Sequence, residues 1–576
     1  MNSSTPEPLV LLRRYRGITA LVAAAVFIRL SGLSEWWLNP DEGIYYSLIT
    51  RDSFDGFWTE VLANAHPPLY YMLLRALGSF TWDFSFLRAF SVVWGAAGMV
   101  GIWAVARLLA TPTPSEHAAT EASVIEGAAV DSHGRASSDE GSADEGSSVA
   151  VGAGFIAAFI VAFAPTPVQM SQVMRPYAFQ TALLAWALFC LLIHLREPSA
   201  RRLAAYLSLT CLALLTHYSS VLALGAFGIV VLLDGAQHGF GRTAWRKLAA
   251  WHLVPAALVV GLYLFHLRPL AASALADEAL DGWLLPFMIQ SPADVWMSLL
   301  GYQHHLAGPW LRGPLALLFL GAVGLAMYRR DLRVVGVGAG AVLVAMVAAA
   351  LGAYPFGSTR HAAWATVFVV PVLGWFVATA LEAGSAGTRR RVLLGLCGLL
   401  AVGGPVGTLI GADRARWAPE ERVLREPYLQ AMLPELDPTG EPELMVMSDQ
   451  TFNLLLPFYP AEREQAVFSA DSSAFHFPYG ERRILVSRTW AFLSLANGRP
   501  GTDLQTFLHR SADEFAELQL RSRDRVMFVD GGWGLPASVQ IQNVMSAGTP
   551  LVASSRVVPG LHSFVLWTEP LLGTPP

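Results

Sequence analysis

Two acidic residues just beyond an apolar segment are the first candidates for chemistry. Asp41 and Glu42 follow the sequence Trp36-Trp37-Leu38-Asn39-Pro40, whose tryptophans suit a membrane interface. Carboxylates at such a surface can take a proton from a reacting group or hold a metal ion. The same residues can instead begin a helix, because proline suits the first helical position and acids favour the first turn. Composition alone favours the helix start, so neighbouring motifs must decide.

Three further motifs place polar residues beside prolines or at turns. His66-Pro67-Pro68-Leu69-Tyr70-Tyr71 precedes an apolar, roughly helical stretch, and its prolines fix the angle at which a helix along the interface begins. Arg175-Pro176-Tyr177 opens a later apolar run. Arg360-His361 ends a turn that starts at Tyr354. An arginine at such a position can hold an anion or extend to the lipid headgroups.

The elements that must position these residues are strongly apolar. Charged residues make up 14% of the 576 residues, against about 25% in ordinary soluble chains, and this excludes a purely soluble protein. A net charge of −5 opposes binding of nucleic acid. All three cysteines lie in apolar runs, which excludes a disulfide framework and a CxxC metal site.

Eleven apolar runs approach the length that spans a membrane, which is about 20 residues. They lie near residues 16–34, 88–110, 149–167, 172–195, 203–216, 219–234, 248–267, 312–328, 334–352, 362–381 and 391–411. The 203–216 and 219–234 pair is short. The first run contains Arg29 and lacks a cleavage site, so we expect a retained anchor in which Arg29 pairs with a loop carboxylate.

Arginine clusters orient these spans by the positive-inside rule. They lie near residues 13–16, 196–202, 242–247, 329–333 and 389–391, always on the N-terminal side of the predicted membrane. The N-terminus is therefore expected in the cytoplasm, with loops 35–87 and 268–311 and the C-terminal segment outside. The exception is segment 111–148, whose eight acidic residues and one arginine predict a disordered cytoplasmic linker.

The predicted domains follow from these segments. Residues 1–110 hold the first two transmembrane helices and the outer loop 35–87, and residues 149–411 hold the remaining transmembrane helices. Residues 412–576 contain 20 acidic and 14 basic residues, a density close to that of soluble proteins. Strand-like runs at 444–447, 483–486, 525–529 and 564–567 alternate with helix-like stretches such as 503–520, which predicts a periplasmic or extracellular α/β domain.

The order of the motifs resembles that of a known family. An acidic pair in the first outside loop, then Pro-Pro-Leu-Tyr-Tyr, then Arg-Pro-Tyr at the start of a later span resembles the bacterial GT-C glycosyltransferases. These include relatives of the protein O-mannosyltransferases (glycosyltransferase family 39), of the lipid A aminoarabinose transferase and of the rhizobial lipopolysaccharide galacturonosyl transferases. The resemblance covers roughly residues 15–411. It implies an α-helical polytopic membrane protein of GT-C type. The apolar runs add the expectation of about 11 transmembrane helices, and the composition of residues 412–576 adds that of a C-terminal soluble α/β domain, to which the resemblance does not extend.

The resemblance also implies an activity. It is the transfer of a sugar from a polyprenyl-phosphate donor to a lipid, glycan or protein hydroxyl, on the outer face of the cytoplasmic (inner) membrane. Asp41 corresponds to the catalytic base and Glu42 to its adjacent helper. A leaving phosphate needs cations against its developing charge, and Arg175 and Arg360 are candidates for that role.

Further residues near these motifs complete the predicted site. His66, Tyr70, Tyr177 and His361 are expected to bind the donor phosphate or the substrate. Some members of the family hold a divalent metal near the loop acids and others do not, so a metal is left open.

Two other polar motifs have weaker interpretations. His217-Tyr218 lies in a short turn and is interpreted as an interfacial anchor. Tyr302-Gln303-His304-His305 can line the acceptor entry, but adjacent histidines point in different directions, which argues against a shared metal. The GxGxxA pattern at 336–341 lies inside an apolar run without a preceding strand, which indicates close helix packing and not a nucleotide site.

Two rival functions remain open at this stage. Many spans with sparse charge also describe a transporter or lipid flippase, although the chain shows no repeated halves. A catalytically silent factor of envelope assembly would occupy the same membrane and tolerate the loss of Asp41 and Glu42.

Overall fold

The structure is a computed structural model of the 576-residue chain. It describes residues 7–62, 64, 66–111, 142–237, 241–271, 284–308, 310–382, 387, 391, 395, 425–432, 443–455, 457, 474–479, 482–487, 525–529, 555–557 and 564–568. The predicted run 391–411 and the predicted helix 503–520 fall almost entirely outside these residues. Most of the linker 111–148 does so too, while residues 142–148 form the start of a helix.

The chain forms two compact units. The first contains residues 1–31, 88–268 and 280–417, and the second contains residues 32–87, 269–279 and 418–576. The second unit therefore joins the first predicted outer loop to the C-terminal segment. Helices α5 (Phe84–Ala110) and α13 (Arg268–Ala271) cross the boundaries between the two units.

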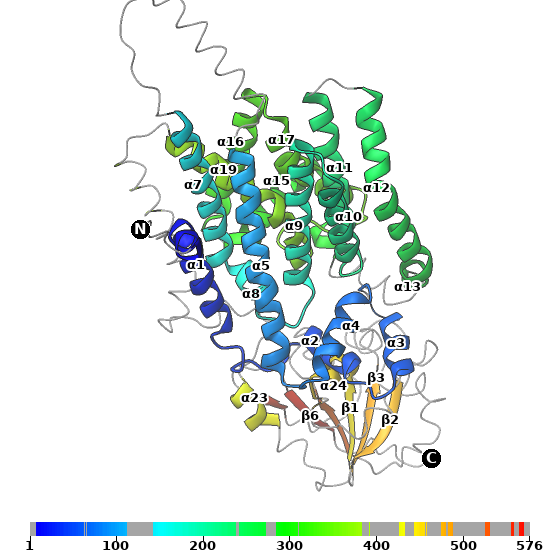
Figure 1. Ribbon diagram of the computed structural model, residues 1–576. Helices are drawn as coiled ribbons and strands as arrows, with labels where there is room; N and C mark the ends of the chain where they lie inside the picture. The colour runs from blue at the N-terminus through cyan, green and yellow to red at the C-terminus, as the bar shows by residue number, and fades with distance from the viewer. Residues whose placement is uncertain are drawn as a thin grey trace, which may run out of the picture. The chain divides into compact units, whose positions relative to one another are not determined.

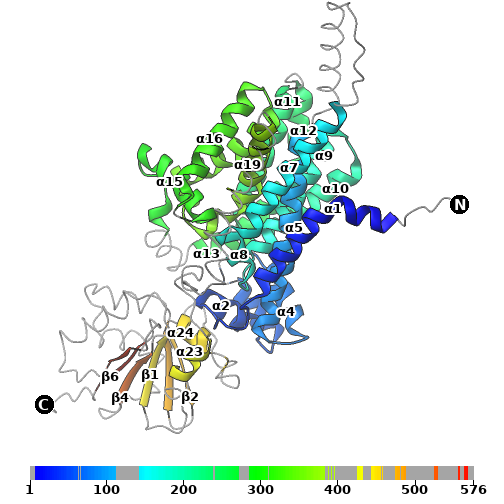
Figure 2. The ribbon, with the colours of Figure 1, turned by 90° about the vertical axis from the view of Figure 1, so that its left-hand side faces the viewer.

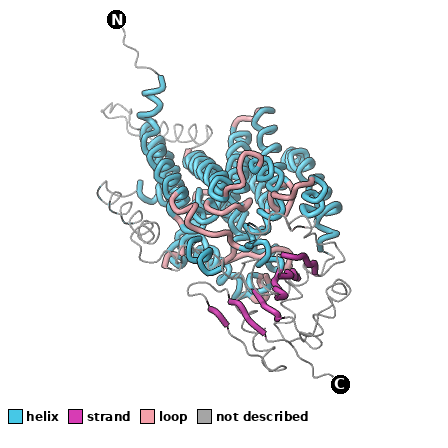
Figure 3. The backbone as a smooth tube through the Cα atoms, turned by 90° about the horizontal axis from the view of Figure 1, so that it is seen from below, coloured by secondary structure: helices cyan, strands magenta, loops and turns pink. Residues whose placement is uncertain are grey.

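The first unit is built from helices packed as a bundle (Figures 1 and 3). Besides α5, its long helices are α1 (Glu7–Leu30), α7 (Ser142–Phe163), α9 (Tyr177–Arg196), α10 (Ala200–Leu214), α11 (Ser220–Gln237), α12 (Arg242–Leu262), α15 (Pro292–Ala307), α16 (Arg312–Tyr328), α18 (Ala341–Ala350) and α19 (Thr366–Glu382). Shorter helices connect them: α8 (Pro165–Ser171), η1 (Tyr263–Leu267), η2 (Leu285–Phe287), α17 (Leu332–Val335), η3 (Gly336–Gly340) and η4 (Arg360–Ala365).

Part of the predicted set of eleven spans is found among the described helices. By length and hydropathy, six of the described helices can cross a membrane, or up to eight if each bent pair of helices forms one span. The bent pairs are α7 with α8, at 63°, and α15 with α16, at 112°. Helix α10, at the predicted run 203–216, has only 15 residues. The count of eleven stays a prediction.

The break between α7 and α8 is held by a buried arginine. Arg29 of α1 is fully buried and donates hydrogen bonds to the carbonyl oxygens of Val161, at 2.6 Å, and Ala162, at 3.0 Å, in the last turn of α7. In return, the Gln172 amide donates to the carbonyl oxygens of Ile28 and Arg29 at the end of α1. The carboxylate partner predicted for Arg29 was therefore wrong. Its partners in α7 are main-chain carbonyls of the last helical turn, which no following turn of the same helix can satisfy.

Small residues allow the helices of this unit to approach closely. A Cβ added at Gly374 of α19 would lie 2.5 Å from the Ala153 carbonyl oxygen of α7. A Cβ at Gly340 would lie 2.8 Å from the Ile229 side chain of α11. The glycine pattern at 336–341 thus packs helices together, as the sequence indicated.

The second unit combines short helices with a mixed sheet (Figure 2). Its helices are α2 (Pro40–Ile49), α3 (Phe54–Leu62), α4 (Leu69–Gly78), α23 (Arg425–Met432) and α24 (Asp449–Leu455). Its strands are β1 (Glu443–Ser448), β2 (Ala474–Tyr479), β3 (Arg482–Ser487), β4 (Arg525–Val529), β5 (Ser555–Val557) and β6 (Phe564–Thr568), in the order β2-β3-β1-β4-β6-β5. Strand β1 is parallel to β3 and β4, and the outer pairs are antiparallel.

The four runs predicted as strands coincide with β1, β3, β4 and β6. Strands β2 and β5 were not predicted. Polar residues interrupt both, since β2 reads AFHFPY and β5 reads SRV.

The arginine at the α7 break provides a test of the fold. We expect Arg29→Ala to lower the free energy of unfolding by about 2–4 kcal/mol, because it leaves buried carbonyls without a donor. Thermal unfolding of the detergent-solubilised protein measures this effect. Arg16→Ala, at an exposed position on the same helix, is the matched control and should change little. Equal melting temperatures for the two variants would contradict the capping role.

Candidate functional site

The two predicted acids have different environments in the second unit. Glu42 is fully buried and forms a capping box with Asn39: the Glu42 amide donates to Asn39 Oδ1 at 2.9 Å, and the Asn39 amide donates to Glu42 Oε2 at 3.2 Å. The helix-start interpretation is therefore confirmed for Glu42. Asp41 is half-buried in the same first turn, outside the capping box. The helix dipole favours a negative charge at this position.

An aromatic cluster lies one turn along α2 from Asp41. Tyr45 is buried. Its ring stacks on that of Tyr71, with ring centres 4.8 Å apart, and packs edge-to-face with that of Tyr70, with ring centres 5.8 Å apart. The His66 ring lies 5.9 Å from that of Tyr45. Since residues four apart share a helix face, Asp41 lies on the face of α2 that carries this cluster. The structure thus brings His66 and Tyr70 to the acid-bearing helix.

Charged residues fix the far end of α2. Arg75 of α4 donates to the carbonyl oxygens of Ile49, at 2.9 Å, and Arg51, at 2.6 Å, and its guanidinium lies 4.8 Å from the Phe57 ring centre. The Arg51 side chain pairs with Glu60 of α3. These contacts join α2, α3 and α4 into one frame around the aromatic cluster.

The first unit holds the other predicted residues in a second polar cluster. Arg175 and Tyr177 are both buried at the start of α9, and the Arg175 guanidinium lies 5.3 Å from the Tyr177 ring centre. The Tyr177 ring lies 5.2 Å from that of His217, which in turn lies 6.4 Å from the His361 ring. His217 therefore connects Tyr177 to His361.

The protonation of His217 follows from its hydrogen bonds. Its Nδ1 accepts the Ser219 amide at 3.1 Å, so Nδ1 carries no proton and the neutral ring carries its proton on Nε2. Gln180 fixes this turn by donating to the hydroxyls of Ser219 and Ser220, each at 2.8 Å. The His217 side chain is 2% exposed and is buried among its neighbours, so the prediction of an interfacial anchor was wrong.

The turn before α19 supplies the last two predicted residues. Arg360 opens η4 and is half-buried, and the Thr359 hydroxyl accepts the His361 amide at 3.4 Å. The Tyr354 hydroxyl lies 3.4 Å from His361 Nδ1. Burial raises the pKa of Tyr354 above its usual value, so this hydroxyl stays protonated and can donate.

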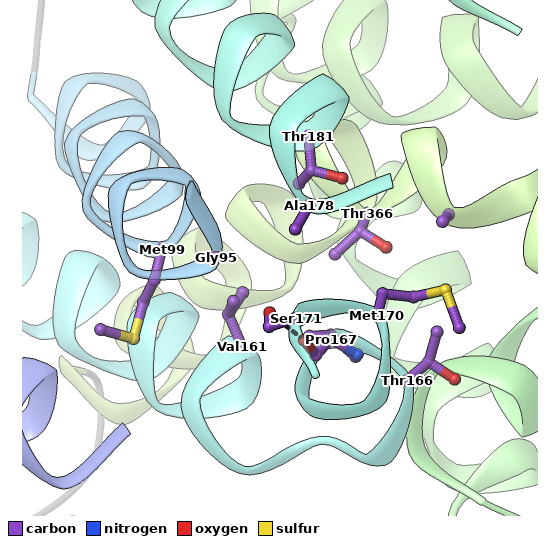
Figure 4. A pocket seen from close by; sticks show the side chains of 11 residues that line it. Gly95, Met99, Val161, Thr166, Pro167, Met170, Ser171, Ala178, Thr181 and Thr366 are labelled. Carbon is purple, nitrogen blue, oxygen red and sulfur yellow. Dashed lines mark hydrogen bonds between the residues drawn. The ribbon is translucent and has the colours of Figure 1, made fainter. Parts of the chain in front are cut away.

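A small cavity lies elsewhere in the first unit, between α5, α7, α8, α9 and α19 (Figure 4). Its volume is about 30 Å³, enough for one water molecule. Hydroxyls of Thr166, Ser171, Thr181 and Thr366 line it. It is too small for a sugar, and its lining contains none of the predicted site residues.

The structure divides the predicted site residues into two groups. Asp41, Glu42, His66 and Tyr70 belong to the second unit. Arg175, Tyr177, Arg360 and His361 belong to the first unit.

Several residues of these clusters were missed as site candidates. Tyr45 and Tyr71 give the acid-bearing face its aromatic wall, and His217, Ser219 and Gln180 connect the second cluster. The spacing of Asp41 and Tyr45 by four residues is a signal that could have identified Tyr45.

No metal-binding cluster is evident. Among the residues that the structure describes, no group of three or more His, Cys, Asp or Glu side chains is placed to hold a metal ion.

Comparison with known proteins finds similarity in structure only. No protein-family model and no curated protein matches the chain. The crystal structure of ArnT from Cupriavidus metallidurans bound to undecaprenyl phosphate matches at 13% identity and a TM-score of 0.48, over 98% of this chain and 100% of that one. The archaeal oligosaccharyltransferase AglB from Archaeoglobus fulgidus, in complex with an inhibitory peptide and a dolichol-phosphate, matches at 12% identity and a TM-score of 0.44, over 90% and 70% of the two chains. At such values, the activity of this chain has to be argued from its own residues.

The capping box separates the two acids, because Glu42 belongs to it and Asp41 does not. We expect Asn39→Ala to lower the free energy of unfolding by about 1 kcal/mol, because the first turn of α2 loses its side-chain acceptor. Asp41→Asn should lower it by less, since Asp41 lies outside the capping box. Chemical denaturation in detergent measures both variants. A larger loss for Asp41→Asn would show that Asp41 is itself the structural residue.

Proposed function

We propose that this chain is an inverting membrane glycosyltransferase. It transfers a sugar from a polyprenyl-phosphate donor to a hydroxyl of a lipid, glycan or protein on the outer face of the cytoplasmic membrane. The N-terminus lies in the cytoplasm, and the C-terminal segment lies outside. The order of the sequence motifs and the two polar clusters support this proposal.

The position of Asp41 is the observation that carries the proposal. Glu42 satisfies the first turn of α2, so Asp41 is not needed to begin the helix. A half-buried carboxylate on the helix face that carries an aromatic cluster suits a general base, because the half-buried His66 ring can hold an acceptor near it. Glu42 then serves as the residue that fixes the turn and takes no part in the chemistry.

The reaction needs this base and a place for the leaving phosphate. Asp41 accepts the proton of the acceptor hydroxyl as that oxygen attacks the anomeric carbon. The bond between this carbon and the phosphate oxygen breaks, and the anomeric configuration inverts because one displacement occurs. The phosphodiester leaves as a phosphomonoester with one more negative charge. Donors must therefore be placed where that charge develops.

The cluster of the first unit has the donors for such a phosphate. Arg175 supplies a planar guanidinium and Tyr177 a phenol, both buried at the start of an apolar helix. Arg360 and His361 add a second cationic position, joined to the first through His217. Arg175 is buried and Arg360 is half-buried, and a guanidinium at the end of an apolar helix suits the phosphate of a lipid.

A transporter or lipid flippase is the alternative function. Sparse charge among apolar helices also suits a carrier. A flippase leaves the mass of its substrate unchanged, whereas a transferase creates a new molecule, so the products distinguish the two functions.

Replacing Asp41 tests the proposed chemistry. Cells lacking this protein should retain both the unused donor and the unmodified acceptor, so their lipid extract provides both. Liposomes of this extract with purified wild-type protein should yield a sugar-modified product by mass spectrometry. With Asp41→Asn, the rate should fall by at least about 100-fold, because the base is lost.

The control for this experiment is Asp55→Asn, an exposed acid on α3 of the same loop, which should keep the wild-type rate. Full transfer by Asp41→Asn would refute the assignment of the base. A wild-type protein that moves lipids between leaflets without changing any mass would favour the flippase. If the acceptor is a protein, the envelope proteins of the deficient cells replace the lipid acceptor.

Replacing Arg175 tests the phosphate site in the same assay. Arg175→Lys keeps the charge but loses the bidentate fork and the contact with the Tyr177 ring, so we expect the rate to fall by about 10- to 100-fold. Arg312→Lys, exposed at the start of α16, is the matched control. Wild-type rates with Arg175→Lys would place the phosphate elsewhere.

A further inference from the structure

A helix of the C-terminal segment packs directly on the acid-bearing helix. In two perpendicular views α24 lies beside α2 (Figures 1 and 2), and both belong to the second unit. The contact is closest at Gly43, the residue after the acidic pair. A Cβ added there would lie 3.0 Å from the Asn453 carbonyl carbon, 3.1 Å from its oxygen and 3.2 Å from the Leu454 amide nitrogen.

These three atoms belong to the main chain, so no side-chain rotation can make room for a larger residue at Gly43. Any side chain there must displace one of the two main chains, by a few tenths of an ångström for a methyl group. The close approach of the two backbones thus favours glycine. The contact fixes the distance of α24 from the first turn that holds Asp41.

A second contact holds the chain just before α2. Trp37 is 3% exposed, and its indole Nε1 donates to the Leu454 carbonyl oxygen at 3.1 Å. This carbonyl lies in the last turn of α24, where helical carbonyls lack partners within the helix. The Trp37 ring also stacks on the ring of Tyr428 of α23, with the two ring centres 5.6 Å apart.

The main chain adds a third connection to the same region. The Arg425 amide, at the start of α23, donates to the Glu35 carbonyl oxygen at 2.8 Å. The contacts of α23 and α24 therefore lie on both sides of the capping box, at residues 35 and 37 before it and at residue 43 after it.

We infer that α23 and α24 hold Asp41 in its reactive position, with Gly43 and Trp37 as the positioning residues. This inference rests on the proposed function. It assigns the C-terminal segment a role in the rate of the chemical step. A shift of a few tenths of an ångström to an ångström at a reacting group lowers a rate by about 10- to 100-fold.

The experiment uses the full chain in liposomes of the extract from deficient cells. Initial rates over a dilution series of that extract give an apparent kcat and KM. We expect Gly43→Ala to lower kcat by about tenfold and Gly43→Val by about 100-fold, with KM within twofold of wild type. Trp37→Phe keeps an aromatic ring at this position but loses the indole Nε1 hydrogen bond. This variant should lower kcat several-fold.

The matched control is Gly324→Ala in α16. An added Cβ there meets no described atom within 4 Å, so this variant gains the same helix propensity without a clash. Its kcat and KM should equal those of wild type. A merely structural role for Gly43 and Trp37 would lower the amount of folded protein and leave kcat per folded molecule unchanged.

The outcomes separate this inference from the proposed function. Transfer by wild type that is lost in Asp41→Asn but kept at full kcat in Gly43→Ala and Trp37→Phe would overturn the inference alone. These two conservative variants decide the question if Gly43→Val does not fold. The absence of any transfer by wild type would instead overturn the proposed function, and this inference with it.

Discussion

Helix ends inside an apolar body must find hydrogen-bond donors for their carbonyls, and the first unit depends on how Arg29 meets this constraint. Its guanidinium satisfies the end of α7, while the Gln172 amide satisfies the end of α1. The break between α7 and α8 is stable because of this exchange. Three residues after Gln172 the chain reaches Arg175, so the same contacts that permit the break also fix where the polar cluster begins.

The second unit meets the same constraint at both ends of α2. Asn39 and Glu42 form the capping box at the first turn of α2. At the other end of this helix, Arg75 donates a hydrogen bond to the carbonyl oxygen of Ile49. Glu42 is therefore committed to the start of the helix, whereas Asp41 lies beside it outside the capping box. On the proposed function, Asp41 is the acid that takes part in the chemistry. The adjacency of the two acids in the sequence conceals this difference in their places.

The parts of the fold that sequence predicted are those set by local composition. Apolar runs located β1, β3, β4 and β6, and the glycine pattern at 336–341 indicated close helix packing. Six of the eleven predicted spans coincide with described helices that can cross a membrane, and two more coincide with bent pairs of helices. Run 203–216 falls on α10, which has only 15 residues, and run 391–411 lies almost entirely outside the described residues. The partners of Arg29 in α7 lie more than 130 residues away and are main-chain carbonyls, which no sequence pattern marks.

For the candidate site, sequence identified the charged residues but not what connects them. His217 was interpreted as an interfacial anchor, yet it is buried and its ring lies near those of Tyr177 and His361. Because the Ser219 amide donates to its Nδ1, its neutral ring presents an Nε2–H donor. On the proposed function this matters for the leaving phosphate. A cluster of arginines alone would also hold the spent phosphomonoester tightly. A neutral donor such as His217 would add a hydrogen bond to the developing charge at a smaller electrostatic cost to product release.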